Sequence, residues 1–319
     1  MHEPRIELPP LLTERASLWG GAAGRAWLDA LPAVLEQLVE RWRIVDVGAP
    51  YPSGASFVAP VVAAGGVRGV VKVPMRGVDL PYPHGNVRHG EAAALRVWAG
   101  DGAVALLDED EETGSMLIER CEPGARLASS VTLEEADDVA AALLPRLWRQ
   151  VPDGVGIPTV DDLATQVVER AERNYASCDP PPCERVLLDD ALRLLDEVRA
   201  TRAERVLLHG DFHHANVLTA GREPWLAIDP LPLVGERAVD AVMFLMFRKG
   251  SMTDPARDWE RSIVRFCRLV GVDVERAKAW MFVRLVSDAL VGVTIGLSVA
   301  QLEAFQEDLW SARLLRSFL

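Results

Sequence analysis

The sequence predicts an α+β protein with two lobes, a β-rich N-terminal lobe over residues 1–120 and a helical C-terminal lobe over residues 121–319. Two patterns predict this fold class. Short runs rich in valine and alanine, such as "GVRGVVKVPM", are broken by glycine and proline in the first third of the chain, which is typical of strands joined by turns. From Thr132 onward, apolar residues recur at helical spacing.

The N-terminal lobe begins with a predicted helix at Gly24–Trp42, kinked or split at Pro32 because proline lacks a backbone N–H. Three short strands follow, and then a helix at Gly90–Gly100, which ends at its last glycine. Next come two apolar runs joined by an acidic turn with Gly114, which predict a hairpin. We expect the connector between the lobes near Glu119–Gly124.

The C-terminal lobe opens with a capping-box pattern from Thr132 to Glu135. Helices are predicted at residues 159–177 and 185–203, separated by the break "CDPPPC", and further helices lead to the C-terminus. The polar segment "LHGDFHHAN" follows the predicted helix at 185–203. After it comes a second small strand pair, "NVLTA" and "PWLAIDP", which precedes the last helices.

The net charge argues against a nucleic-acid partner. Lys and Arg number 34 against 47 Asp and Glu, a balance of −13, whereas nucleic-acid binding needs basic side chains that neutralise phosphates. An acidic chain suits a cationic small-molecule substrate, although in most acidic proteins the charge serves solubility alone.

Cysteine usage and hydropathy indicate a cytoplasmic protein. The four cysteines form no CxxC pair and no regular framework, so we expect free thiols in a reducing compartment; they are Cys121, Cys178, Cys183 and Cys267. The N-terminus has no apolar run of signal-peptide length, and "ALVGVTIGLSVA" is too short to cross a bilayer. We expect a monomer without a membrane partner.

The polar segment admits three kinds of chemistry. A zinc site would use the imidazoles of His209, His213 and His214, but the local pattern is strand to loop, and no HExxH motif or cysteine pair supports it. A hydrolase with a serine nucleophile would need a GxSxG turn, which the sequence lacks.

Phosphoryl transfer is the third possibility, and it predicts companions that are present. A base that accepts a hydroxyl proton is followed five residues later by a metal-binding asparagine in kinases, and Asp211 and Asn216 have this spacing. A second metal-binding aspartate belongs just after the next hairpin, where Asp229 lies.

The N-terminal lobe supplies the matching nucleotide-binding residues. Lys72 lies in the strand pattern "GVVKVP", where it could reach phosphates, and Glu91 on the next helix is its expected partner. Gly48 and Gly54 lie where a phosphate-covering hairpin belongs. Lys72 alone could equally be a solvent-facing edge residue. The order and spacing of all these elements together favour a kinase.

The motifs "HGDFHHANVL", "AIDP" and "GERAVD" resemble the aminoglycoside phosphotransferase family of small-molecule kinases, which has a bilobal protein-kinase-like fold. Within it the chain is most similar to the branch of streptomycin 6-phosphotransferases and hydroxyurea kinases. The resemblance implies ATP and Mg²⁺ as cofactors. The roles it implies are Asp211 as catalytic base, Asn216 and Asp229 as Mg²⁺ ligands, Lys72 with Glu91 on the α- and β-phosphates, and the backbone of Glu119–Cys121 on adenine.

Four further residues receive roles from this resemblance and from their local patterns. Asp240 braces the catalytic loop, and His209 is a buried scaffold residue. His213, like its neighbour His214, either fills the loop or faces the substrate. Asp288 is an isolated carboxylate on an apolar helix, which either binds a cationic substrate or pairs with an arginine. Relatives often have a polar residue at the position of Leu231, a departure that concerns the acceptor.

The resemblance implies an ATP-dependent phosphotransferase that modifies a hydroxyl of an aminoglycoside antibiotic, streptomycin, and gives resistance. The alternatives are a kinase for another small hydroxyl substrate such as hydroxyurea, and a non-catalytic pseudokinase that only binds ligands. A pseudokinase would lack Lys72, Asp211 or Asp229, and all three are present.

Overall fold

The computed structural model describes residues 8–78, 90–152, 154–179, 181, 183–201, 204–246, 255–292, 299–317 and 319. The chain forms two compact units. The first consists of Met1–Ala125 and Leu218–Ile228, and the second of Arg126–Val217 and Asp229–Leu319. The hairpin at 218–228 therefore belongs to the first unit, whereas the sequence pattern assigns it to the C-terminal lobe.

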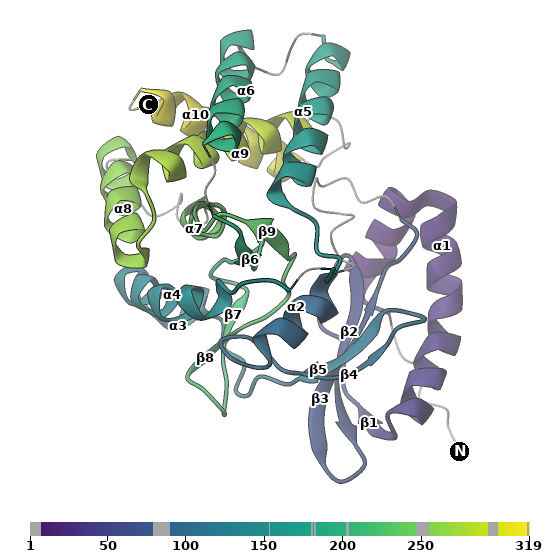
Figure 1. Cartoon of the computed structure of the whole chain (residues 1–319). Helices are drawn as coiled ribbons and strands as arrows, with labels where there is room; N and C mark the ends of the chain where they lie inside the picture. Colours follow the sequence, from purple (N-terminus) through teal and green to yellow (C-terminus); the bar gives the residue numbers. More distant parts are fainter. Residues whose placement is uncertain are drawn as a thin grey trace. The chain divides into compact units, whose positions relative to one another are not determined.

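The first unit is built on an antiparallel sheet with the strand order β1-β2-β3-β5-β4 (Figure 1). The strands lie where the valine-rich runs predict them, and the hairpin with Gly114 forms β4 and β5. Their bounds are β1 Ile44–Val47, β2 Ser56–Ala63, β3 Val67–Pro74, β4 Leu106–Asp110 and β5 Ser115–Glu119. The strand β3 lies at the centre of this sheet, paired with β2 on one side and β5 on the other.

Two helices accompany the sheet, α1 (Pro10–Arg41) and α2 (Glu91–Trp98). The backbone leaves helical geometry within α1 at Gly21, with φ 51° and ψ −120°, while Pro32 lies inside the continuing helix. The predicted break at Pro32 is thus replaced by one at Gly21, because glycine tolerates a positive φ. The buried leucines of α1 share one apolar core with Phe57, Val61 and Val71 of the sheet.

The second unit is mainly helical (Figure 1). Its central helix α9 packs against α5, α6, α7, α8 and α10. The helices are α3 Leu127–Ser130, α4 Leu133–Leu147, α5 Val160–Ser177, α6 Arg185–Ala200, α7 Ala238–Met246, α8 Pro255–Val270, α9 Val274–Gly292 and α10 Val299–Arg316. The predicted capping box is present at the start of α4, where Thr132 and Glu135 bond each other's backbone N–H groups.

Two short antiparallel pairs complete the structure. Strands β6 (Val206–Leu208) and β9 (Leu233–Gly235) pair within the second unit. Strands β7 (Val217–Thr219) and β8 (Trp225–Ala227) form the small pair that the sequence predicts after the polar segment.

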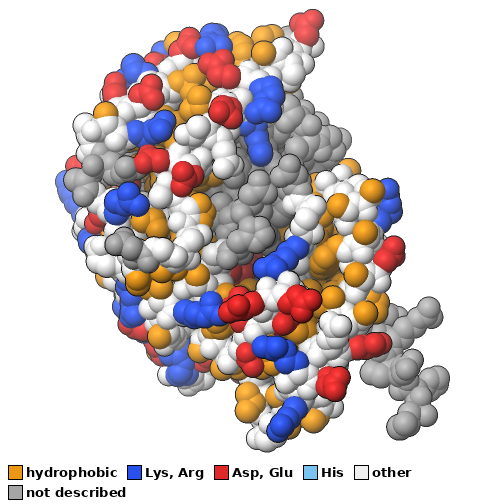
Figure 2. Space-filling model, turned by 45° about the vertical axis from the view of Figure 1, so that its right-hand side comes forward, with side chains coloured by type: hydrophobic (Ala, Val, Ile, Leu, Met, Phe, Trp, Pro, Cys, Tyr) orange, Lys and Arg blue, Asp and Glu red, His pale blue; other side chains and the backbone are white. Residues whose placement is uncertain are grey.

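The surface mixes both charges, and the cysteines form no disulfide among the described residues. The face drawn in Figure 2 carries acidic and basic side chains side by side, with apolar side chains scattered between them. All four cysteines are free thiols, as predicted. Among the described residues, none of the helices combines the length and the apolar character that a bilayer span requires.

Candidate active site

The polar segment forms a loop between β6 and β7 in the second unit. Leu207, Leu208 and Phe212 are fully buried and anchor it to the core. The side-chain amide of Asn216 donates to the backbone carbonyl of Asp211 at 3.0 Å and to its carboxylate at 3.1 Å. The five-residue spacing thus closes a compact turn that brings these two side chains together.

A buried carboxylate from α7 holds the start of this loop. Asp240, which is fully buried, accepts hydrogen bonds from the backbone N–H of Gly210 at 2.8 Å and of His209 at 2.9 Å. The indole N–H of Trp148 donates to the same carboxylate at 3.0 Å. Burial raises the pKa of Asp240 to about 6, and these three hydrogen bonds oppose that rise by stabilising the carboxylate.

Gly210 is required by the geometry of the loop. Its φ is +75°, and a Cβ atom at this position would lie 1.8 Å from the carbonyl oxygen of Leu231. Leu231 also donates its N–H to the carbonyl of His209 at 2.9 Å. The segment after Asp229 is therefore pressed directly against the start of the loop, where no side chain fits.

Asp211 is ionised at neutral pH. Burial raises its pKa, but the side chain of His213, with Nε2 3.6 Å from the carboxylate, lowers it, and the net pKa lies below the ordinary value. The negative charge of Asp229 raises the pKa of Asp211, so the two carboxylates are close enough to interact. Asp229 has a φ of +56°, a left-handed conformation that non-glycine residues seldom adopt.

The three histidines of the loop have different surroundings. His209 is fully buried, and its Nδ1 accepts the N–H of Asp211 at 3.3 Å. His214 is also buried and stacks on Phe244 at 4.1 Å. Neither ring nitrogen of His214 has a hydrogen-bond partner among the residues that the structure describes, and burial lowers its pKa to about 4. In the same described part of the chain, no three His, Cys, Asp or Glu side chains are arranged to hold a metal ion.

Lys72 and Glu91 form a buried ion pair in the first unit. The Nζ atom of Lys72 lies 2.6 Å from each carboxylate oxygen of Glu91, and the two residues are 5% and 4% exposed. Lys72 lies on β3, opposite Val58 of β2 and Met116 of β5. Lys72 therefore lies on a central strand and is buried, which excludes the alternative of a solvent-facing edge residue.

The remaining nucleotide-binding candidates are in the same unit. Gly48 and Gly54 lie in the loop between β1 and β2, and Cβ atoms there would contact Pro60 and the side chain of Arg15, respectively. Glu119 ends β5, and its carboxylate is bound by Arg222. Cys121 is half-buried, which raises the pKa of its thiol to about 12.

Asp288 is paired with an arginine, the second of its two alternatives. The Nε atom of Arg284 donates to its two carboxylate oxygens at 2.8 and 2.7 Å. Every residue of α9 from Ala277 to Leu290 is buried except Arg284 and Asp288, which are half-buried. Sequence reasoning missed Arg284, although its spacing of four residues from Asp288 is the signal of a helical ion pair.

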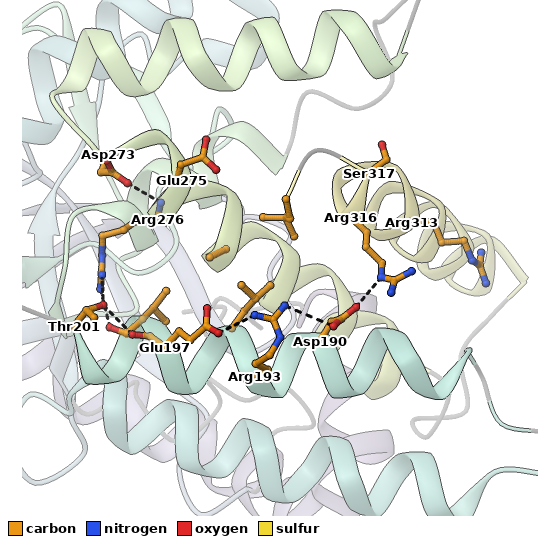
Figure 3. A pocket seen from close by; sticks show the side chains of 14 residues that line it. Asp190, Arg193, Glu197, Thr201, Asp273, Glu275, Arg276, Arg313, Arg316 and Ser317 are labelled. Atoms are coloured by element: carbon orange, nitrogen blue, oxygen red, sulfur yellow. Dashed lines mark hydrogen bonds and ion pairs between the residues drawn. The ribbon is translucent and has the colours of Figure 1, made fainter.

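One pocket of the second unit is lined by none of these residues. It lies between α6, α9 and the end of α10 and has a volume of about 840 Å³ (Figure 3). Its four arginines are each paired with a carboxylate, so they offer no uncompensated positive charge to a ligand; the pairs are Arg193–Glu197, Arg276–Glu236, Arg313–Glu184 and Arg316–Asp190.

Comparison with known proteins decides the family. Residues 41–293 match the aminoglycoside/hydroxyurea antibiotic resistance kinase family. The chain belongs to this family. A streptomycin 6-kinase from Streptomyces glaucescens is 36% identical over 297 residues, which cover 91% of this chain and 92% of the relative. A hydroxyurea phosphotransferase from Kitasatospora aureofaciens is 35% identical over 297 residues, 91% of this chain and 82% of the relative.

Solved structures of the wider kinase group confirm the predicted protein-kinase-like α+β fold. A ternary complex of a thermostable mutant of aminoglycoside phosphotransferase APH(4)-Ia with ADP and hygromycin B matches with a TM-score of 0.58. The match covers 89% of this chain and 98% of that one at 18% sequence identity. At this low identity the likeness concerns the fold alone.

Proposed function

We propose that this kinase transfers the γ-phosphoryl group of ATP to a hydroxyl of an aminoglycoside antibiotic, streptomycin, and that it thereby gives resistance. The observation that carries the proposal is the catalytic loop, in which an ionised Asp211 is bonded to Asn216 and supported by Asp240. The 36% identity to streptomycin 6-kinases supports the choice of acceptor.

Under this proposal the first unit binds the nucleotide. The ammonium group of Lys72, oriented by both oxygens of Glu91, contacts the α- and β-phosphates. The backbone of Glu119–Cys121 forms hydrogen bonds with the edge of adenine. Gly48 and Gly54 lie in the loop that would cover the phosphates.

The side chains of Asn216 and Asp229 fit a magnesium ion. Mg²⁺ prefers oxygen ligands and retains several waters, and these residues offer an amide oxygen and a carboxylate. Since the amide nitrogen of Asn216 makes both bonds to Asp211, its oxygen remains the acceptor that a cation can use. When bound, Mg²⁺ neutralises charge on the phosphates.

Asp211 acts on the acceptor hydroxyl. Its depressed pKa keeps it an ionised hydrogen-bond acceptor at neutral pH, so it orients the hydroxyl and can take its proton as the phosphoryl group is transferred. Asn216 bonds this carboxylate directly, and Asp240 fixes the backbone of His209 and Gly210 just before it. Such positioning is the main contribution a protein makes to phosphoryl transfer.

Hydroxyurea is the second candidate acceptor. The hydroxyurea phosphotransferase is 35% identical to this chain, nearly as similar as the streptomycin kinases. The Arg284–Asp288 pair also favours a neutral acceptor, because the carboxylate that could have attracted a cation already has a positive partner.

A screen of ATP consumption tests the proposal. The purified chain is incubated with MgATP and streptomycin, other aminoglycosides or hydroxyurea, with the Asp211→Ala variant as the blank. We expect the fastest turnover with streptomycin. Faster turnover with hydroxyurea would transfer the assignment to the second candidate, and no turnover above the blank with any acceptor would refute both.

A further inference from the structure

Arg222 and Glu119 form a two-pronged contact inside the first unit. Arg222 lies in the turn of the β7–β8 hairpin, and Glu119 is the last residue of β5, 103 positions earlier. The Nε of Arg222 donates to one carboxylate oxygen of Glu119 at 3.0 Å, and its Nη2 donates to the other at 2.9 Å. Paired hydrogen bonds of this kind fix direction as well as distance, because both groups are planar.

The same contact includes the backbone on either side. The Nη2 of Arg222 also donates to the carbonyl of Ala103 at 3.2 Å. The carboxylate of Glu119 accepts the N–H of Ala105 at 3.0 Å, and the N–H of Glu119 donates to the carbonyl of Ala105 at 2.8 Å. Glu119 is therefore held through both its side chain and its backbone at the point where the connector begins.

The far end of the connector is bound to the same hairpin. Thr219 donates its N–H to the carbonyl of Ala125 at 2.9 Å, and its hydroxyl accepts the N–H of Ala125 at 2.9 Å. The N–H of Gly124 donates to the carbonyl of Thr219 at 3.1 Å. The hairpin is thus hydrogen-bonded to both ends of the connector, through Arg222 at its start and Thr219 at its end.

The Arg222–Glu119 contact is partly shielded from water. The side chain of Glu119 is 19% exposed and that of Arg222 is 41% exposed. Burial raises the pKa of Glu119, but the hydrogen bonds from Arg222 and Ala105 outweigh it, so the pKa lies below its ordinary value. The carboxylate is consequently charged at neutral pH and binds Arg222 as an ion.

We propose that Arg222 is a positioning residue for nucleotide binding, which acts through Glu119 to fix the backbone that receives adenine. This inference rests on the proposed function, in which the Glu119–Cys121 backbone binds adenine. Backbone hydrogen bonds weaken steeply when their distance or angle changes, so a connector released at Glu119 binds the nucleotide less tightly. Arg222 itself makes no contact with the nucleotide in this proposal.

Direct nucleotide titration of variants tests the role of Arg222. In the Arg222→Ala variant we expect the Kd for MgATP, measured calorimetrically without acceptor, to rise roughly three- to tenfold. The KM for ATP rises in parallel, while kcat and the KM for the acceptor stay within about twofold of wild type. Arg222→Lys keeps the charge but loses the planar fork, so its Kd lies between those of wild type and Arg222→Ala.

Two further variants make the test specific. Arg193→Ala removes an exposed arginine that pairs with Glu197 at 2.8 Å on α6, and it serves as the control with unchanged Kd. In a Glu119→Ala background, Arg222→Ala should raise the Kd no further, because Arg222 acts through the missing carboxylate. Full additivity of the two substitutions would overturn the proposal.

Other outcomes separate this inference from the proposed function. A lower Tm with an unchanged Kd for MgATP would reduce Arg222 to a structural role and refute the proposal. A wild-type chain that binds MgATP but phosphorylates none of the acceptors would refute the acceptor assignment alone, since the titration needs no acceptor. A wild-type chain that does not bind MgATP would refute both.

Discussion

The ammonium group of Lys72 lies 2.6 Å from both carboxylate oxygens of Glu91, and both side chains are almost completely buried. Removing one member of a buried ion pair strands the other charge away from water. We expect Glu91→Ala to lower the free energy of unfolding by about 3 kcal/mol and to impair ATP use. Chemical denaturation and ATP titration measure the two effects.

A double variant separates stability from activity at this pair. Lys72→Met with Glu91→Leu replaces both charges by apolar side chains, so it should recover most of the lost stability while remaining inactive. A double variant less stable than Glu91→Ala would contradict this account of the pair.

Asp211→Ala tests the catalytic base. Turnover should fall roughly 10²–10⁴-fold, the usual contribution of a positioned base, while the Tm and the Kd for MgATP remain close to wild type. Single-turnover kinetics with saturating MgATP measure the chemical step. Turnover within threefold of wild type would exclude Asp211 from this role.

Asp229→Ala tests the proposed metal ligand. We expect activity to require Mg²⁺ or Mn²⁺ and this variant to be inactive even at saturating ATP. The added Mg²⁺ should tighten ATP binding to wild type but have a smaller effect on the variant, which calorimetry can measure without turnover. Inactivation by a zinc chelator in excess Mg²⁺ would instead revive the histidine metal site.

We expect His214 to make the protein less stable in acid. Its pKa is about 4 in the folded protein and near 6.5 in the unfolded chain, so the unfolded chain binds the extra proton between these pH values. Stability from this group is therefore complete above pH 6.5 and declines as the pH falls towards 4. At pH 5 the loss is at most about 2 kcal/mol.

Substitution of His214 by Phe or Leu should remove this acid sensitivity. Denaturation of wild type and variant at pH 7.5 and pH 5.0 gives the difference between their free energies of unfolding at each pH. We expect the variant to lose less stability than wild type on acidification. An equal loss in both proteins would assign the acid sensitivity to other groups.

The salt dependence of the acceptor KM distinguishes the two candidate substrates. With a net charge of −13, the chain should attract cationic streptomycin electrostatically. Its KM should then rise between about 20 and 300 mM salt with MgATP saturating, because screening shortens to about 8 Å near physiological ionic strength. Hydroxyurea is neutral, so its KM should change little. A flat KM for streptomycin would contradict electrostatic attraction.

The sequence by itself determines the parts of this kinase that depend on neighbours along the chain. Asp211 and Asn216 are five residues apart and meet within one loop, and the capping box of Thr132 and Glu135 spans a single turn. The valine-rich run "GVVKVP" likewise predicts the strand that carries Lys72. Local backbone geometry is enough to place such groups.

Only the tertiary structure decides which distant segments meet. Arg222 binds Glu119 across 103 residues, and Trp148 binds Asp240 across 92, contacts that no local spacing encodes. The break in α1 likewise falls at Gly21 rather than at Pro32. Close to this break the backbone approaches itself, because a Cβ atom at Gly24 would lie 1.9 Å from the carbonyl oxygen of Ala16. These features depend on close packing between particular backbones, which the order of residue types along the chain does not reveal.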